Sequence, residues 1–125
     1  MRLLTLVCAL SMMASPALAG TTIPEVFRGT WDSPANPTCD PQNGEAQVTI
    51  DDKGLYFSDA SASVQNVKVK NRHEVVLDLV ETVIGSEGSS EGVRRLALSD
   101  DEKFLIVESL LGGTARHVLV RCPAK

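Results

Sequence analysis

The 125-residue sequence has few aromatic residues, few histidines and few cysteines, and these scarcities narrow the classes of function. No C-x-x-C motif is present, which removes the usual signature of a redox or zinc-binding cysteine pair. The only histidines, His73 and His117, have no ligand spacing to a cysteine, and no acidic, basic and nucleophilic residues converge as a catalytic set. We therefore expect no catalytic, cofactor-binding or metal-binding residues, and a protein that is not an enzyme.

The chain also lacks an excess of basic residues and, after its start, a long apolar run. Twelve basic residues face 16 acidic ones, which gives a net charge of −4. This balance argues against binding to nucleic acid or to an anionic membrane surface. No stretch after residue 19 reaches the roughly 20 apolar residues that cross a bilayer, so we expect no membrane span there.

The first 19 residues have the pattern of a secretory signal peptide. Met1–Arg2 is a short basic start, Leu3–Met13 is an apolar run too short to span a bilayer, and Ala17–Leu18–Ala19 offers small residues at a cleavage site. A retained membrane anchor is the alternative. The pattern predicts a signal peptide over 1–19, one domain over 20–125, and a periplasmic or secreted protein.

Two cysteines remain once Cys8 leaves with the signal peptide. In an exported domain of this size, Cys39 and Cys122 are expected to form one disulfide that closes a loop of about 80 residues. A redox or metal-ligating pair is the alternative.

Residues 20–125 read as β-strands separated by turns. Short runs with period-two alternation or β-branched residues recur between Gly, Asn, Asp and Pro clusters. We predict eight strands. Residues 24–31 lead into the first, and the others span 46–50, 55–57, 62–70, 74–84, 93–98, 104–109 and 115–122. A slip of the apolar phase at Gln65–Asn66 predicts a β-bulge. Gly54 is expected to take a positive φ in a hairpin turn, and Gly20–Ile23 to be a frayed start.

Gly29–Thr30–Trp31 resembles the G-x-W motif that opens the first strand in the calycin superfamily, which includes the lipocalins. In that group a basic residue late in the last strand packs over the Trp, and Arg121 stands in a suitable place. A P-x-x-F-x-G-x-W opening and an R-C ending also resemble small exported bacterial proteins of mostly unknown role. Periplasmic metalloprotease inhibitors are a more distant likeness. The resemblance implies an all-β fold, an eight-stranded antiparallel up-and-down barrel closed by Gly29, Trp31 and Arg121.

These observations favour a monomeric binding protein for a small apolar ligand or a protein partner. An inhibitor of a protease or other hydrolase, presenting its N-terminal segment or a loop, is the alternative. A small hydrolase or isomerase is a third possibility. Within the loop over 32–44, Asp32, Asn36 and Asp40 are spaced for a weak Ca²⁺ site. We expect His73 to be a solvated turn residue and Arg94 to be exposed near a strand end.

Overall fold

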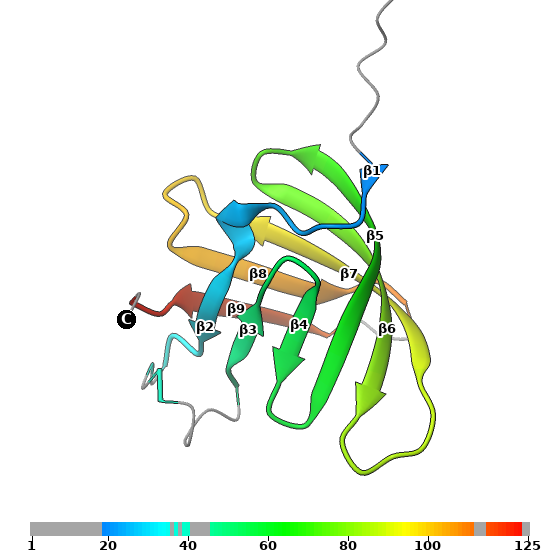
Figure 1. Ribbon diagram of the computed structural model, residues 1–125. Coiled ribbons are helices and arrows are strands. Elements are labelled where there is room, and N and C mark those ends of the chain that lie inside the picture. The colour runs from blue at the N-terminus through cyan, green and yellow to red at the C-terminus, as the bar shows by residue number, and fades with distance from the viewer. Residues whose placement is uncertain (1–18, 36, 38, 41–45, 112–114, 124–125) are drawn as a thin grey trace, which may run out of the picture.

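The chain forms a closed, antiparallel β-barrel of eight strands with one disulfide, as the sequence predicts (Figure 1). The structure is a computed structural model that describes residues 19–35, 37, 39–40, 46–111 and 115–123. Residues 1–18 of the predicted signal peptide lie outside the described residues. The barrel strands are β2 (Gly29–Asp32), β3 (Val48–Ile50), β4 (Gly54–Phe57), β5 (Ala60–Asn71), β6 (Glu74–Val83), β7 (Ser90–Leu98), β8 (Phe104–Ser109) and β9 (Arg116–Arg121).

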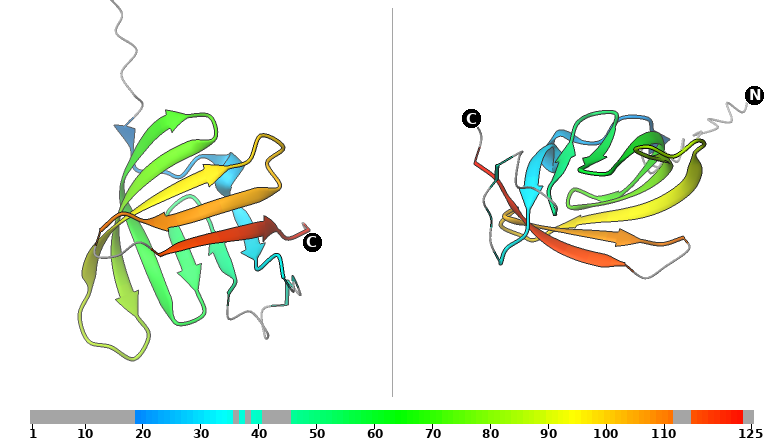
Figure 2. Two further views of the ribbon diagram at one scale, coloured as in Figure 1. Left: turned by 180° about the vertical axis from the view of Figure 1, so that it is seen from behind. Right: turned by 90° about the horizontal axis from the view of Figure 1, so that it is seen from below.

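The strands follow one another around the barrel in chain order, which is the up-and-down topology. Sequential strands pair from β2 to β9, and β9 then pairs with β2 to close the ring (Figure 2). This closing pair, which we call the seam, joins Trp31 to Arg121 and Asp32 to Val120. The β5–β6 hairpin is the longest ladder, and its register shifts between Val64 and Asn66, so the predicted bulge is confirmed.

Two elements near the N-terminus were not predicted. Strand β1 (Ala19–Gly20) pairs with β5, and a 3₁₀ turn, η1 (Glu25–Phe27), leads into β2. The prediction of a frayed start is wrong for Ile23, which is fully buried and donates its backbone N–H to Asp52 O at 2.9 Å. The segment runs across one end of the barrel (Figure 1), and it packs because Ile23 and Phe27 add buried apolar side chains to the core cluster.

The barrel interior is filled by its own side chains. Each strand contributes inward-facing apolar residues to a single buried cluster, in the alternation expected of a sheet with one buried face. Trp31, Leu55, Leu77, Leu96 and Leu105 all have no exposed area. A side chain with no exposed area borders no space able to hold a water molecule. The middle of the barrel is therefore packed like a protein core.

Gly54 is required for a reason other than the predicted one. It does not have a positive φ, in contrast to Gly29, Gly85 and Gly88. Instead, a Cβ added to Gly54 would collide with the backbone carbonyl of Ala62 on the paired strand β5. The glycine thus permits close approach of β4 and β5.

Candidate functional site

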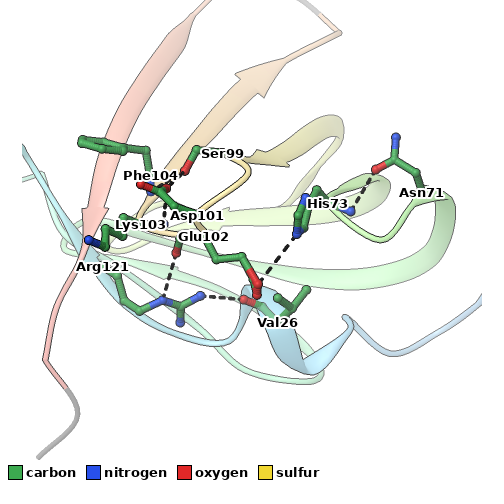
Figure 3. A network of polar contacts seen from close by, with 9 residues as sticks. All are labelled: Val26, Asn71, His73, Ser99, Asp101, Glu102, Lys103, Phe104 and Arg121. Atoms are coloured by element: carbon green, nitrogen blue, oxygen red, sulfur yellow. Dashed lines mark hydrogen bonds and ion pairs between the residues drawn. The ribbon is translucent and has the colours of Figure 1, made fainter.

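One end of the barrel is closed by the contact between Trp31 and Arg121, the two residues singled out by the sequence. The Arg121 guanidinium lies over the indole at 4.2 Å from the ring centroid. It donates to Val26 O at 2.7 Å and Glu102 O at 3.4 Å (Figure 3). It also donates to Arg28 O at 3.1 Å. A planar guanidinium can lie flat on the ring and still donate from its edge to several carbonyls, which a compact ammonium group with three donors does less well. Arg121 therefore ties η1, β2 and the β7–β8 turn together.

Gly29 and the indole N–H complete this end. Gly29 has φ 125°, a conformation that side chains rarely adopt, so the entry to β2 requires glycine. Trp31 Nε1 donates to Phe27 O at 3.0 Å, which satisfies the only polar atom of a fully buried side chain. These contacts are those of a structural closure, since Trp31 Nε1 and the three guanidinium nitrogens of Arg121 all donate to backbone carbonyls.

The disulfide joins Cys39 to Cys122 on the outer side of the seam. Beside it lies Asp32, which is buried and accepts hydrogen bonds from Ser33 N at 2.7 Å, Cys39 N at 2.9 Å and Gln47 Nε2 at 3.3 Å. Burial raises the pKa of Asp32, but these donors outweigh it and hold the pKa below its usual value. Asp32 therefore anchors the loop that carries Cys39.

The same residues do not make a convincing metal site. Asp32, Cys39 and Cys122 bring their ligand atoms within 4.8 Å of one another. The two sulfurs are bonded to each other, however, and so are not thiolate ligands. The Asp32 carboxylate already accepts three N–H groups of its own loop. The suggested Ca²⁺ loop over 32–44 includes Asn36, Thr38 and residues 41–44, which lie outside the described residues.

The opposite end of the barrel is covered by a second arginine on a second aromatic ring. Arg94 points inward on β7, with its Cζ 5.1 Å from the centroid of Phe57, and its Nε donates to Glu81 Oε1 at 2.8 Å. Arg94 is thus half-buried and paired, and the expectation of an exposed Arg94 is wrong. A Cβ on Gly92 would lie 3.1 Å from Glu81 Oε1, so Gly92 makes room for the Glu81 side chain. Aromatic and paired polar groups thus cover both ends of the packed interior.

The outer face of β8 and β9 carries an unusual group of apolar side chains. Phe104 pairs with Val120 and Ile106 with Val118, and all four point away from the core. Phe104 and Val118 are 42% and 44% exposed. The adjoining outer face is polar, since Arg95 there forms ion pairs with Glu74 and Glu108. We call Phe104, Ile106, Val118 and Val120 the outer apolar face.

The outer apolar face borders an open strand edge. On the side away from β8, β9 pairs with β2 only through Val120 and Arg121 among the described residues. Ser109 N bonds to Ala115 O and Arg121 N to Lys103 O, so odd-numbered residues of β9 bond to β8. By alternation, Arg116 and Val118 direct their backbone groups to the open side. Among the described residues, no strand pairs with these N–H and C=O groups, which lie next to exposed apolar side chains.

The histidines do not form a site. His73 lies in the β5–β6 turn as predicted, but its side chain is only 17% exposed and its Nε2 lies 3.7 Å from Glu102 Oε2, so the prediction that it is solvated is wrong (Figure 3). It packs beside η1 at the end that Arg121 closes. His117 is exposed on β9, across from Val107. The two imidazoles therefore belong to different parts of the barrel.

Other residues that could suggest chemistry are structural. Asp51 accepts from Lys53 N and Gly54 N, as an aspartate does in a turn. Burial raises the pKa of Asp51, but these amides hold the pKa below its usual value.

Residues 88–92 match the G-x-S-x-G pattern of hydrolases, a match that the prediction of a non-enzyme overlooked. Its serine, Ser90, opens strand β7, whereas the hydrolase motif requires a turn that enters a helix.

These features define the class of structure as a closed, eight-stranded antiparallel barrel with one disulfide. Comparisons with protein-family models, with curated proteins and with solved structures found no match to this chain. Among the described residues, no helix has the length and apolar character needed to cross a bilayer. A disulfide is compatible with a protein that resides outside the cytoplasm. A functional proposal therefore rests on the geometry of the barrel surface.

Proposed function

We propose that this chain is an exported, non-enzymatic binding protein that binds a protein partner through the outer apolar face. The observation that carries the proposal is the continuous apolar run Phe104–Val107, which continues across the ladder in Val118–Val120. Strands that are apolar on both faces are usually covered on both faces. Here the core covers one face, and the other is exposed. Such patches mark interaction sites in soluble proteins.

The surroundings of the outer apolar face have the character of an interface rim. Glu108 and Arg116 lie opposite each other at one end of the β8–β9 ladder, and Lys103 lies at the other. Protein interfaces commonly combine an apolar centre with a polar rim. The open edge of β9 adds backbone groups to which an extended segment of a partner can bond.

Two expected alternatives receive less support. A small apolar ligand inside the barrel would need space that Leu77, Leu96 and the other fully buried side chains occupy. An inhibitor that inserts its N-terminal segment would need that segment free, whereas Ile23 and Phe27 pack into the barrel end. We still expect the protein to be exported to the periplasm or secreted, with cleavage after Ala19. We also expect it to be a monomer when its partner is absent.

The experiment that tests the proposal is affinity capture with matched variants. Residues 20–125 would be immobilised and exposed to extract from outside the cytoplasm of the source cells. The test variant is Phe104→Ser with Val118→Thr, and the control is Val83→Thr, because Val83 is 52% exposed on β6, away from the outer apolar face. Removing exposed anchors should lower affinity at least about tenfold. The partner should therefore bind the wild type and the control but not the test variant.

Two results would contradict the proposal. Equal capture by all three proteins would place the binding surface elsewhere. Light scattering after size exclusion tests whether a second copy of this chain, rather than another protein, covers the outer apolar face. A wild-type dimer that the Phe104/Val118 variant does not form would show that it does. Circular dichroism of each variant checks that the barrel remains folded.

A further inference from the structure

A hollow of about 320 Å³ lies on the outer wall of the barrel, lined by residues of β4, β5 and β6 and away from the outer apolar face. Its volume is at the low end of the range of roughly 300–1,000 Å³ that ligand sites occupy. The residues that line it are Tyr56, Ser61, Ala62, Ser63, Gln65, Val80, Thr82 and Ser89. Cross-strand pairing brings them together, since Ser61 faces both Tyr56 on β4 and Thr82 on β6.

Tyr56 forms a flat platform at this hollow. Its hydroxyl lies 3.6 Å from the position that a Cβ on Gly54 would take, so the side chain extends back along β4 over the glycine. The hydroxyl is hydrogen-bonded to Asp51, an interaction that raises the pKa of Tyr56. The residue is 43% exposed. The missing side chain at Gly54 and the bond to Asp51 thus hold an accessible aromatic ring against the sheet.

The remaining lining is polar and neutral. Ser61, Ser63, Thr82 and Ser89 supply hydroxyl groups and Gln65 supplies an amide, and each of these groups can both donate and accept hydrogen bonds. Among the described residues that line the hollow, none is ionised at neutral pH. An anionic ligand would find no cation here, and a purely apolar ligand would desolvate these groups without replacing their hydrogen bonds.

We propose that this hollow binds a neutral saccharide unit, with one face of the sugar ring against Tyr56 and its hydroxyl groups bonded to the serine, threonine and glutamine side chains. A saccharide combines an apolar C–H face with a rim of hydroxyls. Its C–H hydrogens carry partial positive charge, which suits the negative face of an aromatic ring. Both properties match the lining, and the site is separate from the protein-binding face proposed above.

The test is titration with neutral oligosaccharides. The probes are the hexasaccharides of β-1,4-glucose, β-1,3-glucose, α-1,4-glucose and N-acetylglucosamine, followed by calorimetry and by amide chemical shifts in NMR. Tyr56→Ala should weaken binding roughly tenfold, because it removes the stacking surface. Tyr56→Phe keeps the ring and should bind within a few-fold of the wild type. Phe104→Ala removes an exposed aromatic from the other wall and should leave saccharide binding unchanged.

Each result of the titration either supports saccharide binding in the hollow or overturns it. Shifts at residues 61–65 and 80–82 that Tyr56→Ala weakens would support the proposal. Failure of every neutral probe to bind the wild type up to about 10 mM would overturn it, since the free energy of binding would then be below about 3 kcal/mol. Equal binding by Tyr56→Ala, or preferred binding of a polyanionic probe such as heparin hexasaccharide, would also overturn it. None of these results depends on the partner bound at β8–β9.

Discussion

Removing the disulfide should destabilise the barrel by an amount that follows from the chain length that it closes. Cys39 and Cys122 are separated by 83 positions. In the chain-entropy model, a loop of this length contributes roughly 4–5 kcal/mol by restricting the unfolded chain. The test variant replaces both residues with alanine in the protein of residues 20–125.

The folded state should tolerate this change, so the full entropic effect should be measurable. Cys39 N remains bonded to Asp32, and Cys122 N remains bonded to Thr30 O at 2.9 Å. The cost should therefore appear in the unfolded state, which becomes more extended. Because the surface exposed on unfolding increases, the urea m value should rise as the free energy of unfolding falls.

Equilibrium urea unfolding, followed by fluorescence of the single tryptophan, measures both quantities. The expected loss of roughly 4–5 kcal/mol corresponds to a fall in Tm on the order of 20 °C or more. The wild type in a reducing agent should behave like the variant. A loss below about 2 kcal/mol with an unchanged m value would refute the reasoning, because it would show an unfolded chain that the disulfide hardly restricts.

Three further changes test other parts of the barrel. Arg121→Lys should lower the free energy of unfolding by roughly 1–3 kcal/mol, because an ammonium cannot both stack on Trp31 and donate to three carbonyls; equal losses in Arg121→Lys and the exposed control Arg116→Lys would contradict this role. Gly54→Ala should cost roughly 1–3 kcal/mol or more in thermal unfolding, because its Cβ collides with the carbonyl of the facing strand; an unchanged Tm would show that β4 and β5 can separate freely. Burial raises the pKa of Asp32, but its amide donors leave it below the usual value near 3.9. Its contribution to stability should therefore be fully present above about pH 5 and be lost as pH falls through the folded-state pKa. In Asp32→Asn, the urea midpoint should therefore depend less on pH below about pH 5 than it does in the wild type. Parallel curves for the two proteins would refute this role of Asp32.

The barrel itself was predictable because its signals are local. Alternation and turn residues located the eight strands, and the phase slip at Gln65–Asn66 located the bulge. The disulfide followed from the cysteine count, given the predicted leader. The contact of Arg121 with Trp31 was expected from the likeness to G-x-W barrels, since nothing in spacing alone joins residues at opposite ends of the chain.

The parts that escaped prediction depend on register. Two residues such as Ala19–Gly20 carry no strand pattern, and β1 exists only because β5 extends beyond β4. The pair of Glu81 and Arg94 requires that β6 and β7 align so that both side chains point inward. The outer apolar face did have a signal, because Phe104–Val107 is apolar at consecutive positions rather than alternate ones.

The seam between β2 and β9 also determines the order in which the barrel can form. Neighbouring strands are otherwise sequential in the chain, so their hairpins can form within microseconds with little loop entropy to overcome. The seam must bring together Trp31 and Arg121, which are 90 positions apart (121 − 31). Until it closes, β2 and β9 are open edges at which other chains can add strands. Oxidation of Cys39 and Cys122 before folding would shorten that interval, so the disulfide should protect the nascent chain from aggregation as well as stabilise the finished barrel.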